Sequence, residues 1–478
     1  MIMSFAFISA RAANTGVLLL LIGLLSSSGH ADPVDYESQV KPLLTERCYT
    51  CHGALKQEAG LRLDTGTFIR KGGDSGGALN SSDPITSLLI ERISSDEPTQ
   101  RMPPKGDPLT PPQIEMLQDW IGQGAKSPPD EQPQATPPQY QHGDISIPTA
   151  SEAEPKRTTV STHLAHQYLE DATVAWSKQH KCISCHTNAT YMFVRPALSP
   201  TLGKPQETTR EFFLSELKTF ATTDKTKLDE GVHPAQLIYL AAGLAEWDAH
   251  VTKQLSPETE QAIDLMFALQ REHGSWGAVD CWPPYESDAY HLATVAAMAI
   301  SSAPGWETKV TETNNEQMLK NVAQLKSYLQ STPPHDYGRT LLLWSAARMP
   351  GLIDDARKTD LIDMLTRHQR EDGGWSLRTM AAPEAWGQGN RAEKLRSESN
   401  FSNPESDGHM TGLAIIALRE SGLPVQDARI QRGITWLQNN QRESGRWWTR
   451  SLNTDGPHFI TYSGTALPLL ALQWCDTQ

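Results

Sequence analysis

The sequence predicts an all-α protein, and three features of the chain support this fold class. From about residue 158 onward, segments rich in Ala and Leu, such as 235–242, 291–300 and 411–418, are separated by turns that contain Gly and Pro. The alternation of apolar and polar residues that is typical of half-buried strands is scarce. A sequence unit also recurs at the ends of several of these helices, which indicates stacked helix pairs.

The first 31 residues have the pattern of an export signal. Arg11 precedes an apolar run from Val17 to Leu25, and Gly29-His30-Ala31 fits a small-x-small cleavage site before Asp32. The run is short for a membrane span, and an uncleaved anchor is the alternative. We therefore expect a periplasmic mature protein that begins near Asp32 and keeps no membrane span.

Composition divides the remainder into three regions. We expect residues 32–126 to form one compact unit. Residues 127–157 are rich in Pro, Gln, Glu and Ser and have almost no apolar periodicity, so we expect a flexible linker. Residues 158–478 contain the Ala- and Leu-rich helices.

The charge of the chain excludes some classes of partner. There are 42 Lys and Arg against 56 Asp and Glu, a formal net charge of −14. Nucleic-acid binding favours clustered basic charge, so no nucleic-acid partner is expected. Adsorption on anionic lipid is disfavoured for the same reason.

The recurring unit is Q-x-x-x-G-x-W, at residues 270–276, 369–375 and 441–447. Its Gly ends a helix in the left-handed conformation that only Gly adopts cheaply. The Trp then turns back over the last helical turn, and the Gln amide can cap backbone groups of a neighbouring helix. The pattern therefore predicts a structural staple rather than a chemical role.

Four of the six cysteines lie in two C-x-x-C-H motifs, Cys48 to His52 and Cys182 to His186. Two thiols at this spacing can reach the two vinyl groups of one haem, and the following His then lies under the iron. A redox dithiol or half of a zinc site is the alternative for a single motif. We predict two haem c groups, bound covalently through Cys48 and Cys51 and through Cys182 and Cys185. His52 and His186 are the predicted proximal iron ligands.

Each haem has a second axial position. For the first haem, Met102 in Arg101-Met102-Pro103-Pro104 fits a loop ligand downstream of His52, whereas Met116 lies in an amphipathic helix and is interpreted as core. For the second haem, His458 is a candidate because a closed ring of helices brings its last repeat beside its first. His166 is the local candidate, and an open sixth position is the third option.

The N-terminal unit resembles the planctomycete-type cytochrome c domain over nearly all of residues 34–126. The resemblance rests on the first C-x-x-C-H motif and on the segments 40–44, 60–64, 72–76, 101–104 and 120–125. It implies a small helical cytochrome with His52 and Met102 as axial ligands. Arg62 and Asp64 would orient the haem propionates or the loop, and a simple surface ion pair is the alternative.

The three Q-x-x-x-G-x-W units resemble the QW motifs of the squalene-cyclase and terpenoid-cyclase superfamily, over roughly residues 230–478. The resemblance implies an α/α toroid, in which outer helices surround inner helices around a cavity. The acidic D-x-D-D motif of the cyclases is absent, so terpene cyclisation is not expected. Protein prenyltransferases on the same toroid bind zinc, and Asp280-Cys281 with His409 superficially resembles that site, which leaves zinc as a further alternative.

These observations favour an exported dihaem c-type cytochrome that transfers electrons to or from a periplasmic redox partner protein. The alternatives are a haem-dependent oxidoreductase and a ligand-binding protein that holds a small organic ligand in the toroid cavity. In the oxidoreductase, two repeated Glu-Ser-Asp segments, 286–288 and 405–407, would line the cavity mouth. The competing interpretation is that Asp288 and Asp407 cap the helices that follow them.

Overall fold

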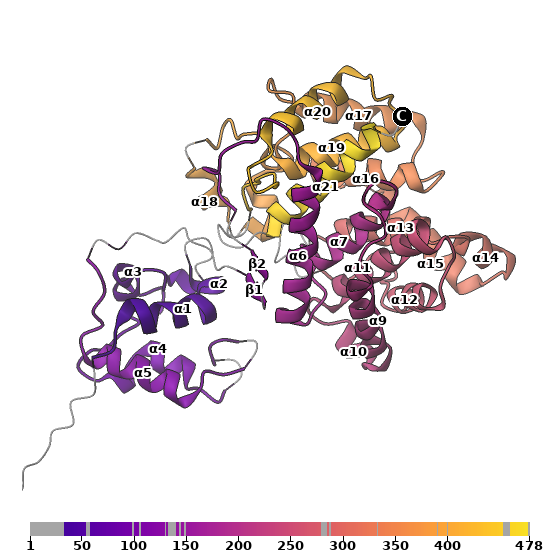
Figure 1. The fold of residues 1–478 in the computed structure, drawn as a ribbon. Helices are drawn as coiled ribbons and strands as arrows, with labels where there is room; N and C mark the ends of the chain where they lie inside the picture. The colour runs from indigo at the N-terminus through magenta and orange to yellow at the C-terminus, as the bar shows by residue number, and fades with distance from the viewer. Residues whose placement is uncertain are drawn as a thin grey trace, which may run out of the picture. The chain divides into compact units, whose positions relative to one another are not determined.

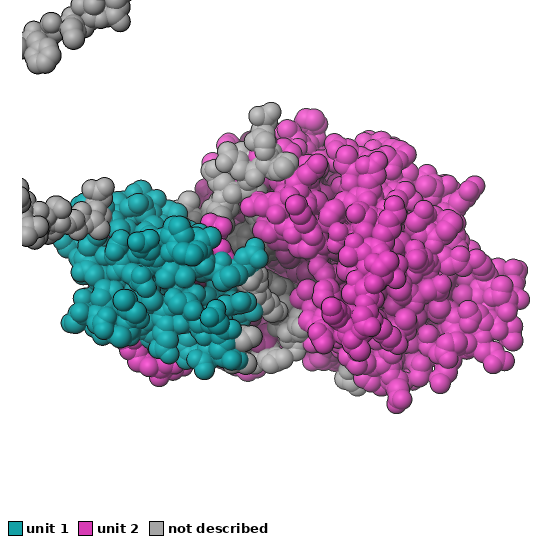
Figure 2. All heavy atoms as spheres, turned by 90° about the horizontal axis from the view of Figure 1, so that it is seen from below, with its two compact units in different colours: residues 1–42, 79–126 teal, residues 43–78, 127–478 magenta. Residues whose placement is uncertain are grey.

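The computed structural model describes residues 33–476 except for 54–57, 98–99, 105–106, 130, 132–139, 143–144, 148–149, 279–283, 286–287, 332, 390, 399 and 453–458. The chain forms two compact units, drawn in different colours in Figure 2. Residues 1–42 and 79–126 form one unit, and residues 43–78 and 127–478 form the other. The predicted signal segment 1–31 lies outside the described residues.

The elements before residue 126 are short helices. In chain order they are η1 (Tyr36–Val40), α1 (Lys41–Arg47), α2 (Tyr49–His52), η2 (Glu58–Gly60), α3 (Gly66–Lys71), η3 (Pro84–Thr86), α4 (Leu88–Ile93) and α5 (Pro111–Gly122). Helix α5 begins with a capping box between Thr110 and Gln113, which satisfies backbone donors of its first turn. It buries Leu117 and Trp120, and the Tyr36 ring stacks on Trp120 at 5.6 Å.

Among the described residues after 126, the chain is an array of helices with one two-stranded sheet. The strands β1 (Tyr140–His142) and β2 (Ile145–Ile147) pair antiparallel, Tyr140 opposite Ile147. The helices are α6 (Thr162–His180), α7 (Asn188–Val194), α8 (Ser199–Leu202), α9 (Glu207–Thr222), α10 (Lys225–Leu228), α11 (His233–Trp247), α12 (Pro257–Ala268), α13 (Ala289–Ser302), α14 (Trp306–Glu312), α15 (Glu316–Gln330), α16 (Asp336–Arg348), α17 (Asp355–His368), α18 (Ala392–Arg396), α19 (Gly408–Glu420), α20 (Ala428–Asn440) and α21 (Phe459–Asp476). Short 3₁₀ or π turns lie at Arg195–Leu198, Asp248–Thr252, Leu377–Thr379, Pro383–Ala385 and Gly387–Gly389.

The inner helices close into a ring. Along the ring α7 contacts α11, α11 contacts α13, and the contacts continue through α16, α19 and α21 back to α7. Outer helices pack on them: α12 on α11, α15 on α13, α17 on α16, α20 on α19, and α6 on α21 (Figure 1). The inner helices are buried on almost every face, as their Ala- and Leu-rich sequences predict. This is the α/α toroid that the repeats predicted.

The three Q-x-x-x-G-x-W units are structural staples, as predicted. The indole N–H groups of Trp276, Trp375 and Trp447 donate to the carbonyl oxygens ten residues earlier, at 2.7–2.8 Å. The Gln side chain of each unit donates to the Gly carbonyl of its own turn and to a backbone carbonyl of the next helical pair. The third unit closes the ring, because Gln441 donates to Ser161 at the start of α6.

Glycine is required in these turns by its backbone angle and by space. The φ angles of Gly274, Gly373 and Gly445 are 98°, 92° and 86°. A Cβ on Gly274 would lie 2.1 Å from the carbonyl oxygen of Gln324. Any larger residue would therefore strain the turn and push the next helical pair away.

A buried ionic cluster ties the other ends of the inner helices together. Arg348 of α16 pairs with Glu246 of α11 and donates two hydrogen bonds of 2.8 Å to Glu420 of α19. Although burial opposes its ionisation, the charge of Arg348 holds the pKa of Glu246 down at about 2. Loss of one partner from such a cluster typically costs 3–5 kcal/mol, because an uncompensated charge remains buried.

The end of the segment predicted to be a flexible linker is fixed against the last repeat of the toroid. Lys156 pairs with Arg442 in an isolated antiparallel bridge, and the Arg157 N–H donates to the Gln441 carbonyl at 2.7 Å. A carboxylate oxygen of Glu154 accepts from the Ser444 N–H at 2.6 Å. The predicted freedom of the linker therefore does not extend to residues 154–157, because their backbone groups have partners.

Within the part of the chain that the structure describes, no helix is both long enough and apolar enough to cross a membrane.

Candidate functional site

The first C-x-x-C-H motif lies on a single helical turn. Cys48 is the N-cap of α2, and the His52 N–H donates to the Cys48 carbonyl at 2.9 Å. Both cysteines are free thiols and are half-buried, whereas His52 is buried. The His52 carbonyl accepts from the Leu63 N–H at 2.7 Å, which joins the motif to the segment that carries Arg62 and Asp64.

The electrostatics of the thiols fit haem attachment better than dithiol redox chemistry. Burial raises the pKa of the Cys48 thiol to about 12, and burial also raises the pKa of Cys182. Redox dithiols and zinc ligands need thiolates that form near neutral pH. Thioether bonds to a haem need two free thiols one turn apart and a neighbouring His, which residues 48–52 provide.

Met102 lies in the loop that follows α4. Its N–H donates to the Arg92 carbonyl at 2.9 Å, and its side chain is half-buried. Met116 lies on α5, whose buried face is made by Leu117 and Trp120. Met102 stays the predicted iron ligand of the first haem.

Arg62 and Asp64 form an ion pair with each other. The guanidinium donates to both carboxylate oxygens, at 2.9 and 2.6 Å, and it also lies over the Phe68 ring at 3.7 Å. Both side chains are therefore fixed within the loop. This arrangement favours the ion-pair interpretation, with the pair holding the loop beside the first motif.

The second C-x-x-C-H motif lies in a turn rather than on a helix. Lys181 ends α6 in the left-handed conformation, and residues 182–187 form the turn before α7. The Asn188 side chain accepts from the Ser184 N–H at 2.8 Å and donates to the Cys182 carbonyl at 2.9 Å. Local side-chain bonds to the backbone compete with helix here, which explains the difference from the first motif.

Two further side chains fix this turn to the toroid. Gln236 of α11 donates to the Ile183 carbonyl at 2.9 Å, and Thr190 of α7 donates to the Cys185 carbonyl at 2.7 Å. Cys185 and His186 are buried. The motif is therefore built into the body of the toroid.

Aromatic rings surround His186. The Trp176 ring meets it edge-on at 4.6 Å, and the Tyr285 ring lies 6.4 Å from it. Its Nδ1 is 2.8 Å from the Thr187 hydroxyl, which orients the imidazole. A fixed partner at Nδ1 orients the imidazole, which an axial haem ligand needs, because Nε2 is then the nitrogen that would bind the iron.

The candidates for the distal ligand of the second haem have different outcomes. His458 lies outside the described residues. His166 is bonded to Glu170 at 2.8 Å, and Glu170 also pairs with Arg195. Neither assignment is tested by these contacts, and the distal ligand stays a prediction.

The interior of the toroid holds a cavity beside this motif. Its volume is about 50 Å³, and its lining is mostly apolar with a few converging polar groups. Tyr285 is hydrogen-bonded to Ser463, whose hydroxyl is 2.7 Å from His409 Nδ1. His409 Nε2 is 3.1 Å from the Tyr337 hydroxyl. A connected set of polar side chains therefore runs along the cavity, starting from the ring next to His186.

Burial keeps the imidazoles of this interior neutral. It lowers the pKa of His291 to about 4 and that of His409 to about 3. His291 Nε2 is 2.9 Å from the Tyr239 hydroxyl, so it belongs to the same lining. Sequence reasoning missed the tyrosines and Ser463, because their approach depends on ring closure and has no local pattern.

Asp288 and Asp407 are helix caps. Asp288 accepts from the His291 N–H at the start of α13, and Asp407 accepts from the Met410 N–H at the start of α19, both at 2.8 Å. The helix-capping interpretation of the Glu-Ser-Asp repeat thus holds at both positions. Asp280, Cys281 and Glu286 lie outside the described residues. Among the residues that are described, no cluster of His, Cys, Asp and Glu has a geometry that could hold a metal ion.

Comparison with known families matches both regions. Residues 48–106 match the family described as Planctomycete cytochrome C, and residues 334–474 match the Squalene-hopene cyclase C-terminal domain. No curated protein matches the chain.

The chain therefore combines a region similar to planctomycete cytochrome c with a region similar to the C-terminal domain of squalene-hopene cyclases, as its motifs predicted. The first match implies haem c in that region and suggests haem-based electron transfer. The second match is consistent with the α/α toroid. The first QW unit, at 270–276, lies outside the matched range yet has the same geometry as the other two.

Proposed function

We propose that this protein is an exported dihaem c-type cytochrome that transfers electrons between its two haems and a redox partner protein. Cys48, Cys51 and His52 would hold one haem c, and Cys182, Cys185 and His186 the other. Haem iron, when bound, supplies one-electron chemistry, and a Met ligand such as Met102 raises its reduction potential.

The observation that carries the second haem is the construction of the turn at 182–187. Cys182 and Cys185 form no disulfide, and they precede an imidazole that is buried and oriented. Asn188, Gln236 and Thr190 fix the backbone of this turn, so that the two thiols and the imidazole keep their relative positions.

Export is supported by the pattern of the first 31 residues and by the chemistry of c-type haem. The proposed location is the periplasm, and the acidic surface suits a partner with a basic docking face. N-terminal sequencing of the protein from the periplasmic fraction should begin at Asp32. Recovery of the intact Met1 end in the cytoplasm would contradict this part of the proposal.

The test is spectroscopic. The purified holo-protein should show optical and EPR spectra of two low-spin haems in the oxidised state, both reducible. One of them should show a sulfur-to-iron charge-transfer band. A protein without reducible haem would overturn the proposal.

The connected polar side chains inside the toroid support a second candidate, a haem-dependent oxidoreductase or ligand-binding protein that uses the toroid. The specific observation is Tyr285, which lines the cavity and lies 6.4 Å from the His186 ring. A high-spin fraction that binds cyanide or peroxide would indicate an open iron beside the cavity, and this second candidate would then replace the first.

A further inference from the structure

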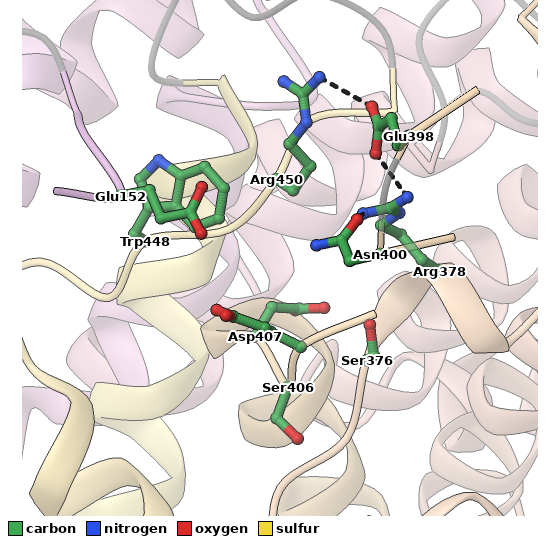
Figure 3. A pocket seen from close by; sticks show the side chains of 10 residues that line it. Glu152, Ser376, Arg378, Glu398, Asn400, Ser406, Asp407, Trp448 and Arg450 are labelled. Atoms are coloured by element: carbon green, nitrogen blue, oxygen red, sulfur yellow. Dashed lines mark hydrogen bonds and ion pairs between the residues drawn. The ribbon is translucent and has the colours of Figure 1, made fainter. Parts of the chain in front are cut away.

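A second, larger cavity lies at the end of the toroid where α19 begins. Its volume is about 430 Å³, within the range of small-molecule sites. Three stretches that are far apart in the sequence line it, 376–378, 398–407 and 448–450, and Glu152 adds a side chain from the segment before α6 (Figure 3). None of its lining residues lines the interior cavity, so this is a separate site.

One wall of the cavity is a fixed polar framework. Glu398 lies between two guanidinium groups: it forms an ion pair with Arg378 at 2.5 Å and accepts a hydrogen bond from Arg450 at 2.8 Å. Arg378 also donates to the Asn400 side-chain oxygen at 3.1 Å, which sets the orientation of the amide. The amide nitrogen of Asn400 then points toward the open space (Figure 3). The wall therefore offers a directed amide donor, and its two guanidinium groups share the single carboxylate of Glu398.

The floor carries a polar group that lacks a partner. The Ser376 side chain is fully buried, and its hydroxyl has no hydrogen-bond partner among the described residues. It points into the space below Asn400 (Figure 3). A buried hydroxyl without a partner is rare and costly, so a bound molecule is the simplest source of the missing bond. Asp407 beside it is held by backbone N–H groups of Met410 and Leu377.

The opposite wall is an indole. Trp447 is fully buried as part of its QW staple, whereas the next residue, Trp448, is half-buried and lines the cavity. Figure 3 shows its ring across the space from Asn400. An apolar ring on the other side of the space from a directed amide donor suits a ligand that has one apolar face and a rim of hydroxyls.

The charges select the class of ligand. Four carboxylates line the cavity against two arginines, which disfavours an anion. The two inner carboxylates, Glu398 and Asp407, already have donors, so a cation gains little from them. We propose that this cavity binds a small neutral saccharide, stacked on Trp448 and hydrogen-bonded to Ser376 and Asn400. This site does not depend on the haem assignments.

The first test is calorimetric titration of the holo-protein with glucose, galactose, mannose, xylose and cellobiose. At least one should bind saturably, and Trp448→Ala should weaken it about tenfold or more, as loss of a stacking contact implies. Trp448→Phe should restore part of the affinity, because it keeps an aromatic face. Trp474→Ala, which removes a half-buried tryptophan of α21, should leave the affinity unchanged.

The sharper test uses Ser376→Ala. Affinity should fall about three- to tenfold, for one lost hydrogen bond, while the melting temperature stays the same or rises, because a buried hydroxyl without a partner is removed. Ser345→Ala is the matched control. Its buried hydroxyl donates to Leu341, so the variant should lower the melting temperature and leave saccharide affinity unchanged.

Three outcomes would overturn the proposal. No saccharide of the panel binds, the saccharide affinity is unchanged in Trp448→Ala and Ser376→Ala, or choline binds in place of the sugars. The haem count of every variant should stay at the wild-type value. A failure here is therefore distinguishable from a failure of the proposed electron-transfer function.

Discussion

The two C-x-x-C-H segments share one sequence pattern, but different interactions hold them in place. Residues 48–52 form one helical turn capped by Cys48, with half-buried thiols. Residues 182–186 lie in a turn tied to three side chains of the toroid, with Cys185 and His186 buried. The motif specifies the spacing of thiols and imidazole, and the surrounding fold decides whether that spacing is held by helix geometry or by tertiary hydrogen bonds.

Because of this difference, mutations in different parts of the chain should affect the two haem sites. The first should respond to changes within its own small region, such as its predicted Met ligand. The second should respond to the stability of the toroid, because α7 and α11 supply its supports. Changes that affect one site and spare the other therefore test the comparison.

The largest expected effect is loss of one haem. Cys182→Ala with Cys185→Ala should remove one covalently bound haem and leave the other, because no thioether can form. Cys48→Ala with Cys51→Ala should remove the other. Intact-protein mass spectrometry and a haemochrome assay measure the count. An unchanged count in either double variant would show that the altered motif holds no haem.

The next effect concerns Met102. Met102→Ala should abolish the sulfur-to-iron charge-transfer band and lower the potential of one haem, by some fraction of the roughly 0.8 V span set by axial ligands. Redox titration followed optically gives both quantities. Met116→Ala is the control and should keep the band. If Met116→Ala loses the band and Met102→Ala keeps it, Met116 is the iron ligand and Met102 is not.

Acid should destabilise the toroid through its buried histidines. His291 and His409 have folded-state pKa values of about 4 and about 3, below the unfolded value of about 6.5. Their contribution is complete above pH ~6.5 and declines as the pH falls toward the folded values, by about 1.4 kcal/mol per pH unit for each residue.

Urea denaturation at pH 7 and pH 5, followed by tryptophan fluorescence, measures this slope. His409→Gln should remove about half of the pH dependence that the two residues contribute. An equal pH dependence in the variant would mean that His409 has the same pKa in the folded protein as in the unfolded chain.

The smallest effect separates the two sites most cleanly. Asn188→Ala removes a fully buried side chain that makes four hydrogen bonds and should cost the toroid about 2–3 kcal/mol. Occupancy of the second haem should fall while the first is retained. Asn80→Ala, at an exposed position, should change neither quantity. Equal loss of both haems in Asn188→Ala would contradict separate support of the two sites.

Much of the fold was predictable because its determinants are local. Each QW unit contains the Gly that must adopt a positive φ, the Trp that returns to its own helix and the Gln that reaches the next pair. The capping by Asp288 and Asp407 is also a local feature, because each side chain bonds to the first turn of the helix that follows it. The C-x-x-C-H spacing is also a property of five consecutive residues.

What the sequence did not reveal depends on distant segments meeting. Tyr285, His409 and Ser463 join only after the ring closes, and no spacing links them. Ser376 and Trp448 lie in different repeats, yet they line one cavity. Composition also does not predict the pairing of Lys156 with Arg442, because a Pro-rich segment can still be held by backbone hydrogen bonds.

The most direct test of the central claim is the haem content of the purified wild-type protein. Intact mass and a haemochrome assay should give two covalently bound haems per chain. One haem per chain, retained when Cys182 and Cys185 are replaced, would contradict the assignment of the second site and reduce the toroid to a partner of a single-haem cytochrome.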